Sequence, residues 1–252
     1  MTVRLDISDE LATITLERSS LNTPTKLAFQ KAVDAASGAR AVLITAEGKN
    51  FCVGQDLGEH VSALEQDPAT AMDTVGIHYN PLIRSLKALT VPVVVAIPGA
   101  CVGAGLGIAL AGDIRVAGTT SSFATAFTGI GLASDSGLSY SLVEALGSSR
   151  ALGLLLLGNR VTAAEALDWG LVNQVVADED VLETAAAIAR GLATGPTAAY
   201  RQVKSLVQAS ASGLSDALDR EARAQTALGQ TVDHKAAVDA FLAKTKASFV
   251  GM

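Results

Sequence analysis

Charge is scarce in this sequence: only 17 % of its 252 residues are Asp, Glu, Lys or Arg, whereas about 25 % is usual for a soluble domain. Because 49 % of the residues are apolar, a compact monomer would have few charges with which to cover its surface. Burial between subunits solves this problem most simply, so we expect a homo-oligomer. The net charge is −6 and no basic run occurs, which leaves nucleic-acid binding without support.

Cysteine and histidine are scarce as well. Cys52 and Cys101 are the only two cysteines, and the three histidines, His60, His78 and His234, are scattered along the chain. No CxxC or His-rich spacing accompanies them, which favours two buried reduced thiols over a disulfide and makes a zinc site improbable. We therefore expect no metal centre.

The patterns typical of a signal peptide and of a membrane-spanning helix are scarce as well. The first 19 residues carry charges throughout, without the apolar core that a signal peptide needs. Residues 91–112 carry no charge, but Pro98 and Gly99 would break a helix in the middle of that stretch. We expect a buried strand, a turn and a short helix there, no membrane contact, and a cytoplasmic location.

Strands alternate with helices over the first 150 residues, which predicts an α/β fold. The patterns indicate a hairpin at 3–16, a helix at 24–36, buried strands at 40–45, 91–97 and 113–118, and helices at 61–65, 79–88 and 102–111. After residue 150 the strands mostly stop. Successive helical patterns follow, among them 214–228 and 235–246.

Two glycine-containing stretches each follow a predicted strand: FCVGQDL at 51–57 and GACVGAGLG at 99–107. Glycine permits tight turns with outward-facing N–H groups, and one N–H from each turn could converge on a carbonyl oxygen as an oxyanion hole. Close backbone packing explains the glycines equally well. Neither a dinucleotide-binding G-x-G-x-x-G nor a phosphate-binding GK[ST] loop is present.

Asp135 is the only charged residue in FTGIGLASDSGLSYSL, residues 127–142. A lone carboxylate in apolar surroundings tends to have a raised pKa, which suits a general acid/base. A structural role is the alternative, because Ser-Asp-Ser before a helix is good N-capping chemistry. Both interpretations remain open from these residues alone.

Four stretches, taken in order, resemble the crotonase (enoyl-CoA hydratase/isomerase) superfamily: FCVGQDL, VPVVVAIPGACVGAGLGIALAGDIRVA, SSFATAFTGIGLASDSG and LGNRVTAAEALDWGLVNQVV. The resemblance covers essentially the whole chain. HYNPLIRSL, IGLASDSGLSYSL, LLGNRVTAAEALDWG and VDAFLAKTKASFVG are most similar to the ring 1,2-epoxyphenylacetyl-CoA isomerases of phenylacetate breakdown. The stretch around Asp135 is also similar to the 4-chlorobenzoyl-CoA dehalogenases.

The resemblance implies a crotonase-like ββα spiral core over residues 1–195 and a helical C-terminal trimerisation region over 196–252, in a trimer or a dimer of trimers. It implies an acyl-CoA substrate, with coenzyme A as part of that substrate and no metal or redox cofactor. The site residues carried over by position are the oxyanion-hole donors, the backbone N–H groups of Gln55 and Ala104, and the CoA-binding positions Leu21, Asn22, Asp56 and Leu57.

The sequence departs from the superfamily at the acids. The two glutamates of the hydratases fall on Gly107 and Phe127, and the dehalogenase's His and Trp fall on Asn80 and Phe127. Hydration needs acids to activate water and to deliver a proton, so these departures weaken the case for a hydratase. They also weaken the case for a dehalogenase. Asp135 matches instead the catalytic acid of the isomerase branch.

We therefore expect an acyl-CoA isomerase that shifts a double bond or rearranges an aromatic epoxide, in fatty acid or phenylacetate metabolism. Asp135 would be the general acid/base, beside an acyl pocket walled by Phe127, Ile130 and Leu132. The alternatives are another crotonase reaction, such as weak hydration or thioester hydrolysis, and a non-catalytic CoA-binding scaffold.

Overall fold

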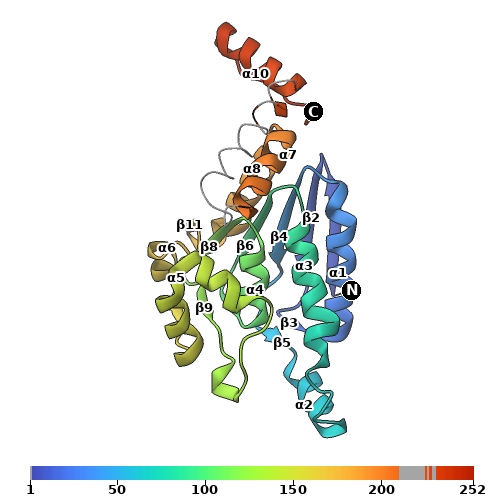
Figure 1. The fold of residues 1–252 in the computed structure, drawn as a ribbon, viewed down its shortest axis with the longest axis vertical. Coiled ribbons are helices and arrows are strands. Elements are labelled where there is room, and N and C mark those ends of the chain that lie inside the picture. The colour runs from blue at the N-terminus through green and yellow to red at the C-terminus, as the bar shows by residue number, and fades with distance from the viewer. Residues whose placement is uncertain (1, 210–224, 226, 229–230) are drawn as a thin grey trace.

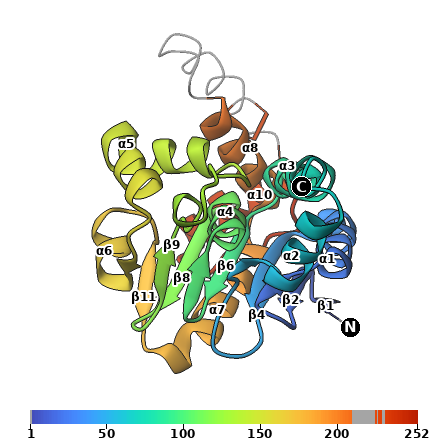
Figure 2. The ribbon, with the colours of Figure 1, turned by 90° about the horizontal axis from the view of Figure 1, so that it is seen from below.

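The computed structural model describes residues 2–209, 225, 227–228 and 231–252. Its largest sheet has six strands, in which β1 pairs with β2 as an antiparallel hairpin and the remaining pairs are parallel. The strand order is β1 (Val3–Ser8), β2 (Leu11–Leu16), β4 (Ala41–Ala46), β6 (Val93–Ile97), β8 (Ile114–Gly118) and β11 (Gln174–Val176). Figure 2 shows this order from β1 near α1 to β11 near α6.

Shorter strands form two further layers. One sheet has the order β10 (Val161–Thr162), β9 (Ser122–Ala124) and β7 (Ala100–Val102), and β3 (Ser20–Leu21) pairs with β5 (Gly54–Gln55). The chain thus repeatedly places one strand in the large sheet, the next in a small one, and then forms a helix. This repetition is the ββα spiral that the sequence predicts.

The helices are α1 (Thr23–Ala35), α2 (Leu57–Gln66), α3 (Asn80–Ala88), α4 (Ala104–Ala111), α5 (Leu138–Leu157), α6 (Ala163–Asp168), α7 (Val181–Ala193), α8 (Thr197–Gln208) and α10 (Val232–Ala243). Short 3₁₀ turns cover Ala36–Gly38, Thr128–Ile130 and Asp178–Asp180, and a π-helical turn, Val75–Tyr79, leads into α3. Figure 1 shows α10 at the end of the molecule beyond α7 and α8.

The inner strands β4 and β6 are buried on both faces of the large sheet, which explains their continuous apolar runs. On β4, Val42 and Ile44 belong to the main core, whereas Ala41 and Leu43 belong to a second core completed by α7. In Figure 1, α1 and α3 lie over one face of the sheet, and they contribute Phe29 and Leu82 to the main core. Cys52 and Cys101 are buried free thiols, as predicted.

Several helices and strands begin or end at residues other than those that the sequence predicts. The helix predicted over 102–111 begins at Ala104, because Ala100–Val102 pairs with β9 instead. The helix predicted at 61–65 is longer, since the Asp56 side chain caps its first turn. Strands β10 and β11 continue the sheets after residue 150. The helical pattern over 214–228 lies mostly outside the described residues.

Among the described residues, one helix, α5, is long and apolar enough by length and composition to cross a membrane. Gly147 has non-helical angles, φ 74° and ψ 161°, and divides α5 into two shorter helices. Neither part has the length of about 20 residues that a membrane span requires. The stretch over 91–112 forms β6 and the short helix α4, as the sequence predicts, and also the strand β7, which it does not predict.

Candidate active site

The two glycine-containing stretches lie against each other. The N–H groups of Phe51 and Cys52 both donate to the carbonyl of Ala100, at 3.1 and 3.2 Å, and the N–H of Val102 donates to the carbonyl of Cys52 at 2.8 Å. The segment before β5 therefore runs beside β7. This brings the end of the first stretch to the start of α4.

Two glycines allow this contact. Gly54 has φ 87° and Gly103 has φ 58°, backbone angles that residues with a side chain rarely adopt. A Cβ atom on Gly54 would lie 3.4 Å from the backbone nitrogen of Ala104. Ala104 is the first residue of α4, where N–H groups have no acceptor within the helix. The glycine at position 54 thus lets the backbone just before Gln55 lie against the first residue of α4, Ala104.

A cavity of about 100 Å³ is lined by Gln55, whereas Ala104 is not among the residues that line it. Six of its lining residues were singled out in the sequence: Gln55, Leu57, Phe127, Ile130, Leu132 and Asp135. The other five were not predicted from the sequence: His60, Met72, Thr74, Val75 and Tyr79. The cavity is mainly apolar, and among the described residues Asp135 is the only carboxylate in its lining.

The Asp135 side chain is half-buried in this lining. The hydroxyl of Ser136 donates a hydrogen bond to its Oδ1 atom at 2.7 Å. Burial raises the pKa of Asp135, while the Ser136 hydrogen bond and the positive charge of Lys26 act in the opposite direction. The direction of this shift is the one that general acid/base work near neutral pH requires.

The capping role considered for the Ser-Asp-Ser sequence is wrong. The N-cap residue of α5 is Gly137, with φ 72°, and it makes no side-chain capping hydrogen bond. The N–H of Leu138 donates instead to the backbone carbonyl of Asp135, at 3.0 Å. Since this turn uses only backbone atoms, the carboxylate of Asp135 is not needed to begin the helix.

The two positions at which hydratases carry their glutamates, Gly107 and Phe127, lie in different surroundings in this structure. Gly107 is buried in α4, and a Cβ atom on it would lie 2.5 Å from the carbonyl oxygen of Ser136. The α4 backbone therefore packs directly against the loop that carries Asp135. Phe127 presents its ring to the cavity. Asn80, where the dehalogenase has its histidine, begins α3 beside the cavity residue Tyr79.

The four expected CoA-binding positions lie close together but in different environments. Leu21 is fully buried, and the side chain of Asn22 caps α1 by accepting a hydrogen bond from the N–H of Thr25 at 3.0 Å. Leu57 is 72 % exposed and lines the cavity, so its side chain is available to a ligand.

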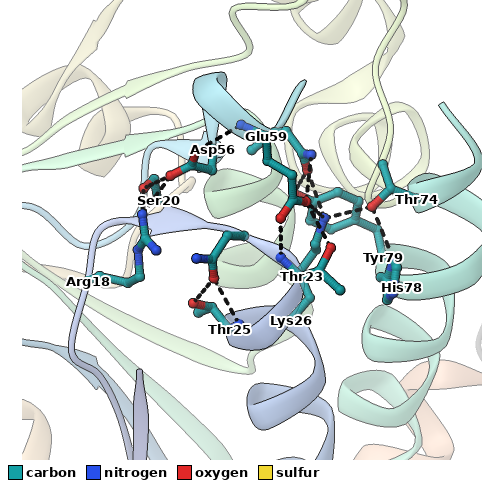
Figure 3. Close-up of polar contacts among 12 residues, drawn as sticks. Arg18, Ser20, Thr23, Thr25, Lys26, Asp56, Glu59, Thr74, His78 and Tyr79 are labelled. Carbon is teal, nitrogen blue, oxygen red and sulfur yellow. Dashed lines mark hydrogen bonds and ion pairs between the residues drawn. The ribbon is translucent and has the colours of Figure 1, made fainter. Parts of the chain in front are cut away.

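Asp56, the fourth of these positions, caps α2. Its carboxylate accepts hydrogen bonds from the N–H of Glu59, the hydroxyl of Ser20 and the guanidinium of Arg18, the last at 2.6 Å (Figure 3). The bonds from Glu59 and Ser20 are the main reason why the pKa of Asp56 is lowered. These bonds fix the turn between β5 and α2.

A buried cation that the sequence does not predict lies beside the cavity. Lys26, in the first turn of α1, forms an ion pair with Glu59 on α2, with 2.9 Å between Nζ and Oε1 (Figure 3). The helical repeat of the sequence could have indicated this burial, because Lys26, Phe29 and Val33 lie on the buried face of α1 at positions i, i+3 and i+7.

Comparisons with known proteins show which family this chain resembles. The chain matches the enoyl-CoA hydratase/isomerase family over residues 6–252. It is 39 % identical to the 1,2-epoxyphenylacetyl-CoA isomerase of Escherichia coli (strain K12), over 84 % of this chain and 81 % of the relative. It is 38 % identical to a Rhodobacter capsulatus protein named "Probable enoyl-CoA hydratase", over 99 % and 98 % of the two chains. A Mycobacterium abscessus crystal structure, described as a "putative Enoyl-CoA hydratase/isomerase", superposes with a TM-score of 0.97 at 52 % identity, covering 99 % of this chain and 100 % of that one.

Proposed function

Because the chain belongs to the enoyl-CoA hydratase/isomerase family, we propose that it isomerises an acyl-CoA thioester with Asp135 as its general acid/base. The observation that carries the proposal is the position of one half-buried carboxylate in an apolar cavity beside the backbone of Gln55. The residues at the two hydratase acid positions, Gly107 and Phe127, cannot transfer a proton.

The proposed reaction uses two parts of the site in turn. The N–H groups of Gln55 and Ala104 hold the thioester carbonyl oxygen, which makes the α-proton easier to remove because they stabilise the enolate oxygen. The Asp135 carboxylate takes the proton from C2 and, as a carboxylic acid, returns it to C4. The double bond moves from C3–C4 to C2–C3, no other reactant is consumed, and Asp135 ends as it began.

Two substrate classes follow for testing. A 3-enoyl-CoA would undergo this double-bond shift, and the similarity to the E. coli 1,2-epoxyphenylacetyl-CoA isomerase adds an epoxyphenylacetyl-CoA as a second candidate. An assay panel of 3-enoyl-, 2-enoyl- and epoxyphenylacetyl-CoA distinguishes the proposal from its rivals. Isomerised product supports it. Hydroxyacyl-CoA or free CoA as the only product would favour another crotonase reaction, and binding without any turnover would favour a scaffold.

We expect the hydration of 2-enoyl-CoA to be slow at best. Loss of a positioned acid or base typically costs about 10²–10⁴-fold in rate, and Gly107 and Phe127 stand at both acid positions. The decrease in absorbance of the conjugated thioester measures the hydration rate directly. A rate typical of a dedicated hydratase would contradict the proposal, because Asp135 alone would then have to activate water as well.

We also propose that the protein assembles as a trimer or a dimer of trimers. Helix α5 carries exposed apolar side chains, among them Leu152, Leu156 and Leu157, which a single chain leaves in water. Light scattering coupled to gel filtration should give three or six times the 25.6 kDa mass of the chain. A monomer at micromolar concentration would contradict this prediction.

A further inference from the structure

Lys26 is a buried cation whose hydrogen-bonding capacity is fully used. Its side chain is 0 % exposed. Its Nζ atom donates to Thr74 Oγ1 at 2.7 Å, Glu59 Oε1 at 2.9 Å and Gln55 Oε1 at 3.2 Å. An ammonium group has three donors and is costly to bury unless each finds an acceptor. These three acceptors match the three donors, which fixes the position of the charge.

The acceptors connect Lys26 to the candidate active site. Gln55, whose backbone N–H is a proposed oxyanion donor, also accepts a hydrogen bond from the Tyr79 hydroxyl at 2.5 Å. The Tyr79 ring centre lies 5.2 Å from the Lys26 ammonium, within the range of a cation–π contact. Gln55, Thr74 and Tyr79 all line the cavity that contains Asp135. Figure 3 shows Lys26, Glu59, Thr74 and Tyr79 grouped between α1, α2 and the turn before α3.

The charges around the cavity come from three elements. The titratable groups that face Asp135 or its immediate neighbours are Lys26 on α1, Glu59 and His60 on α2, and His78 and Tyr79 in the π-helical turn. Burial raises the pKa of the Asp135 carboxyl, and the positive charge of Lys26 acts in the opposite direction. Burial and the charge of Lys26 both lower the pKa of His78.

We propose that Lys26 is a positioning residue of this site, which holds the side chain of Gln55 and supplies a fixed positive charge that favours the carboxylate form of Asp135. Because it names a residue that supports Asp135, the inference rests on the proposed function. Lys26 does not line the cavity itself, so it acts through Gln55, Tyr79 and its electric field. Glu59 offsets part of that field, since it carries the opposite charge at 2.9 Å.

The test exploits the opposite signs of the ion pair. Infrared spectra of protein with ¹³C-labelled aspartate carboxyl groups are recorded against pH, and subtraction of the Asp135→Asn spectra isolates the titration of Asp135. In Lys26→Met we expect the midpoint to rise by about one pH unit, the scale expected for loss of a nearby opposite charge. In Glu59→Gln, where the charge of Lys26 is no longer offset, we expect the midpoint to fall. Lys31→Met, at an exposed lysine of the same helix, should leave it unchanged.

Opposite shifts of the Asp135 midpoint cannot come from structural damage alone, because Lys26→Met and Glu59→Gln both break the same ion pair. Shifts in the same direction, or no shift, would overturn the proposal. The double variant Lys26→Met/Glu59→Gln carries neither charge and should titrate close to the wild type. If Lys26→Met does not fold, Glu59→Gln and the double variant decide the question.

The infrared readout needs no turnover, so it separates this inference from the proposed function. If Asp135→Asn remains active while the opposite shifts are found, the acid/base role of Asp135 fails and the charge of Lys26 is still assigned correctly. In the isomerase assay, Lys26→Met should lower kcat with little change in KM, and the acidic limb of the pH profile of kcat/KM should move to higher pH. An unmoved acidic limb would contradict the inference.

Discussion

Asp135→Asn should reduce isomerase turnover by about 10²–10⁴-fold, because an amide cannot accept the α-proton of the substrate. Binding of acyl-CoA should persist, since the backbone donors at Gln55 and Ala104 are unchanged by the substitution. Turnover is followed by the absorbance of the conjugated 2-enoyl thioester, and binding by calorimetry with a saturated acyl-CoA. Near wild-type turnover in the variant would refute the role of Asp135 as a base.

The fold of the same variant should survive, with the free energy of unfolding changed by about 1 kcal/mol or less, since Asn can still accept the Ser136 hydrogen bond. Burial raises the pKa of Asp135, so its contribution to stability is present at low pH and is lost as pH rises through the folded-state value. Relative to the wild type, Asp135→Asn should therefore become more stable as pH rises. Urea unfolding at pH 5 and pH 8 measures this difference.

Gly107→Ala should displace the loop that carries Asp135. Its Cβ atom would lie 2.5 Å from the carbonyl oxygen and 2.6 Å from the Cβ atom of Ser136, so the loop carrying Asp135 must shift. Overpacking of this kind typically costs about 1–3 kcal/mol of stability. Misplacement of a catalytic group by about 1 Å can cost on the order of 10²-fold in rate. We expect turnover to fall by roughly that factor, with the midpoint of urea unfolding lowered.

Gly191→Ala is the matched control for this substitution. Gly191 lies within α7, and a Cβ atom there would have no neighbour within 4 Å, so neither turnover nor stability should fall. Full activity in Gly107→Ala, with stability unchanged, would show that the α4 backbone does not fix the position of Asp135. The same clash explains why Gly107→Glu should not create a hydratase: the added side chain has no room beside Ser136.

The elements that the sequence predicts well are those with strong periodicity. The hairpin of β1 and β2 alternates apolar and polar residues, and the strands β4, β6 and β8 are short β-branched runs. The strands β3, β5, β7 and β9 contain two or three residues each, too few for a periodic signal. Their positions depend on pairing between distant segments, such as Leu21 with Gln55, which local propensity cannot predict.

Some residues of the candidate site can likewise be predicted from the sequence, and others cannot. Asp135, Gln55 and the apolar residues of the pocket were found because the residues of their stretches resemble a known family. Sequence alone left the capping role of Asp135 open, since Ser-Asp-Ser is good capping chemistry. The structure rules that role out because the backbone of Gly137 makes the turn. Lys26 was missed because a lysine is most often exposed, and its burial depends on three acceptors supplied by other segments.

The central claim is that Asp135 removes the α-proton of a CoA thioester, and hydrogen exchange tests it most directly. Phenylacetyl-CoA has acidic α-protons between its ring and its thioester but no double bond to move, so exchange with D₂O is the only reaction to observe. Since Asp135 is half-buried, its captured proton can exchange with solvent. We predict that proton NMR will show loss of the α-proton signal with the wild type, and a loss about 10²-fold slower or more with Asp135→Asn. Equal exchange rates in the two proteins would contradict the claim.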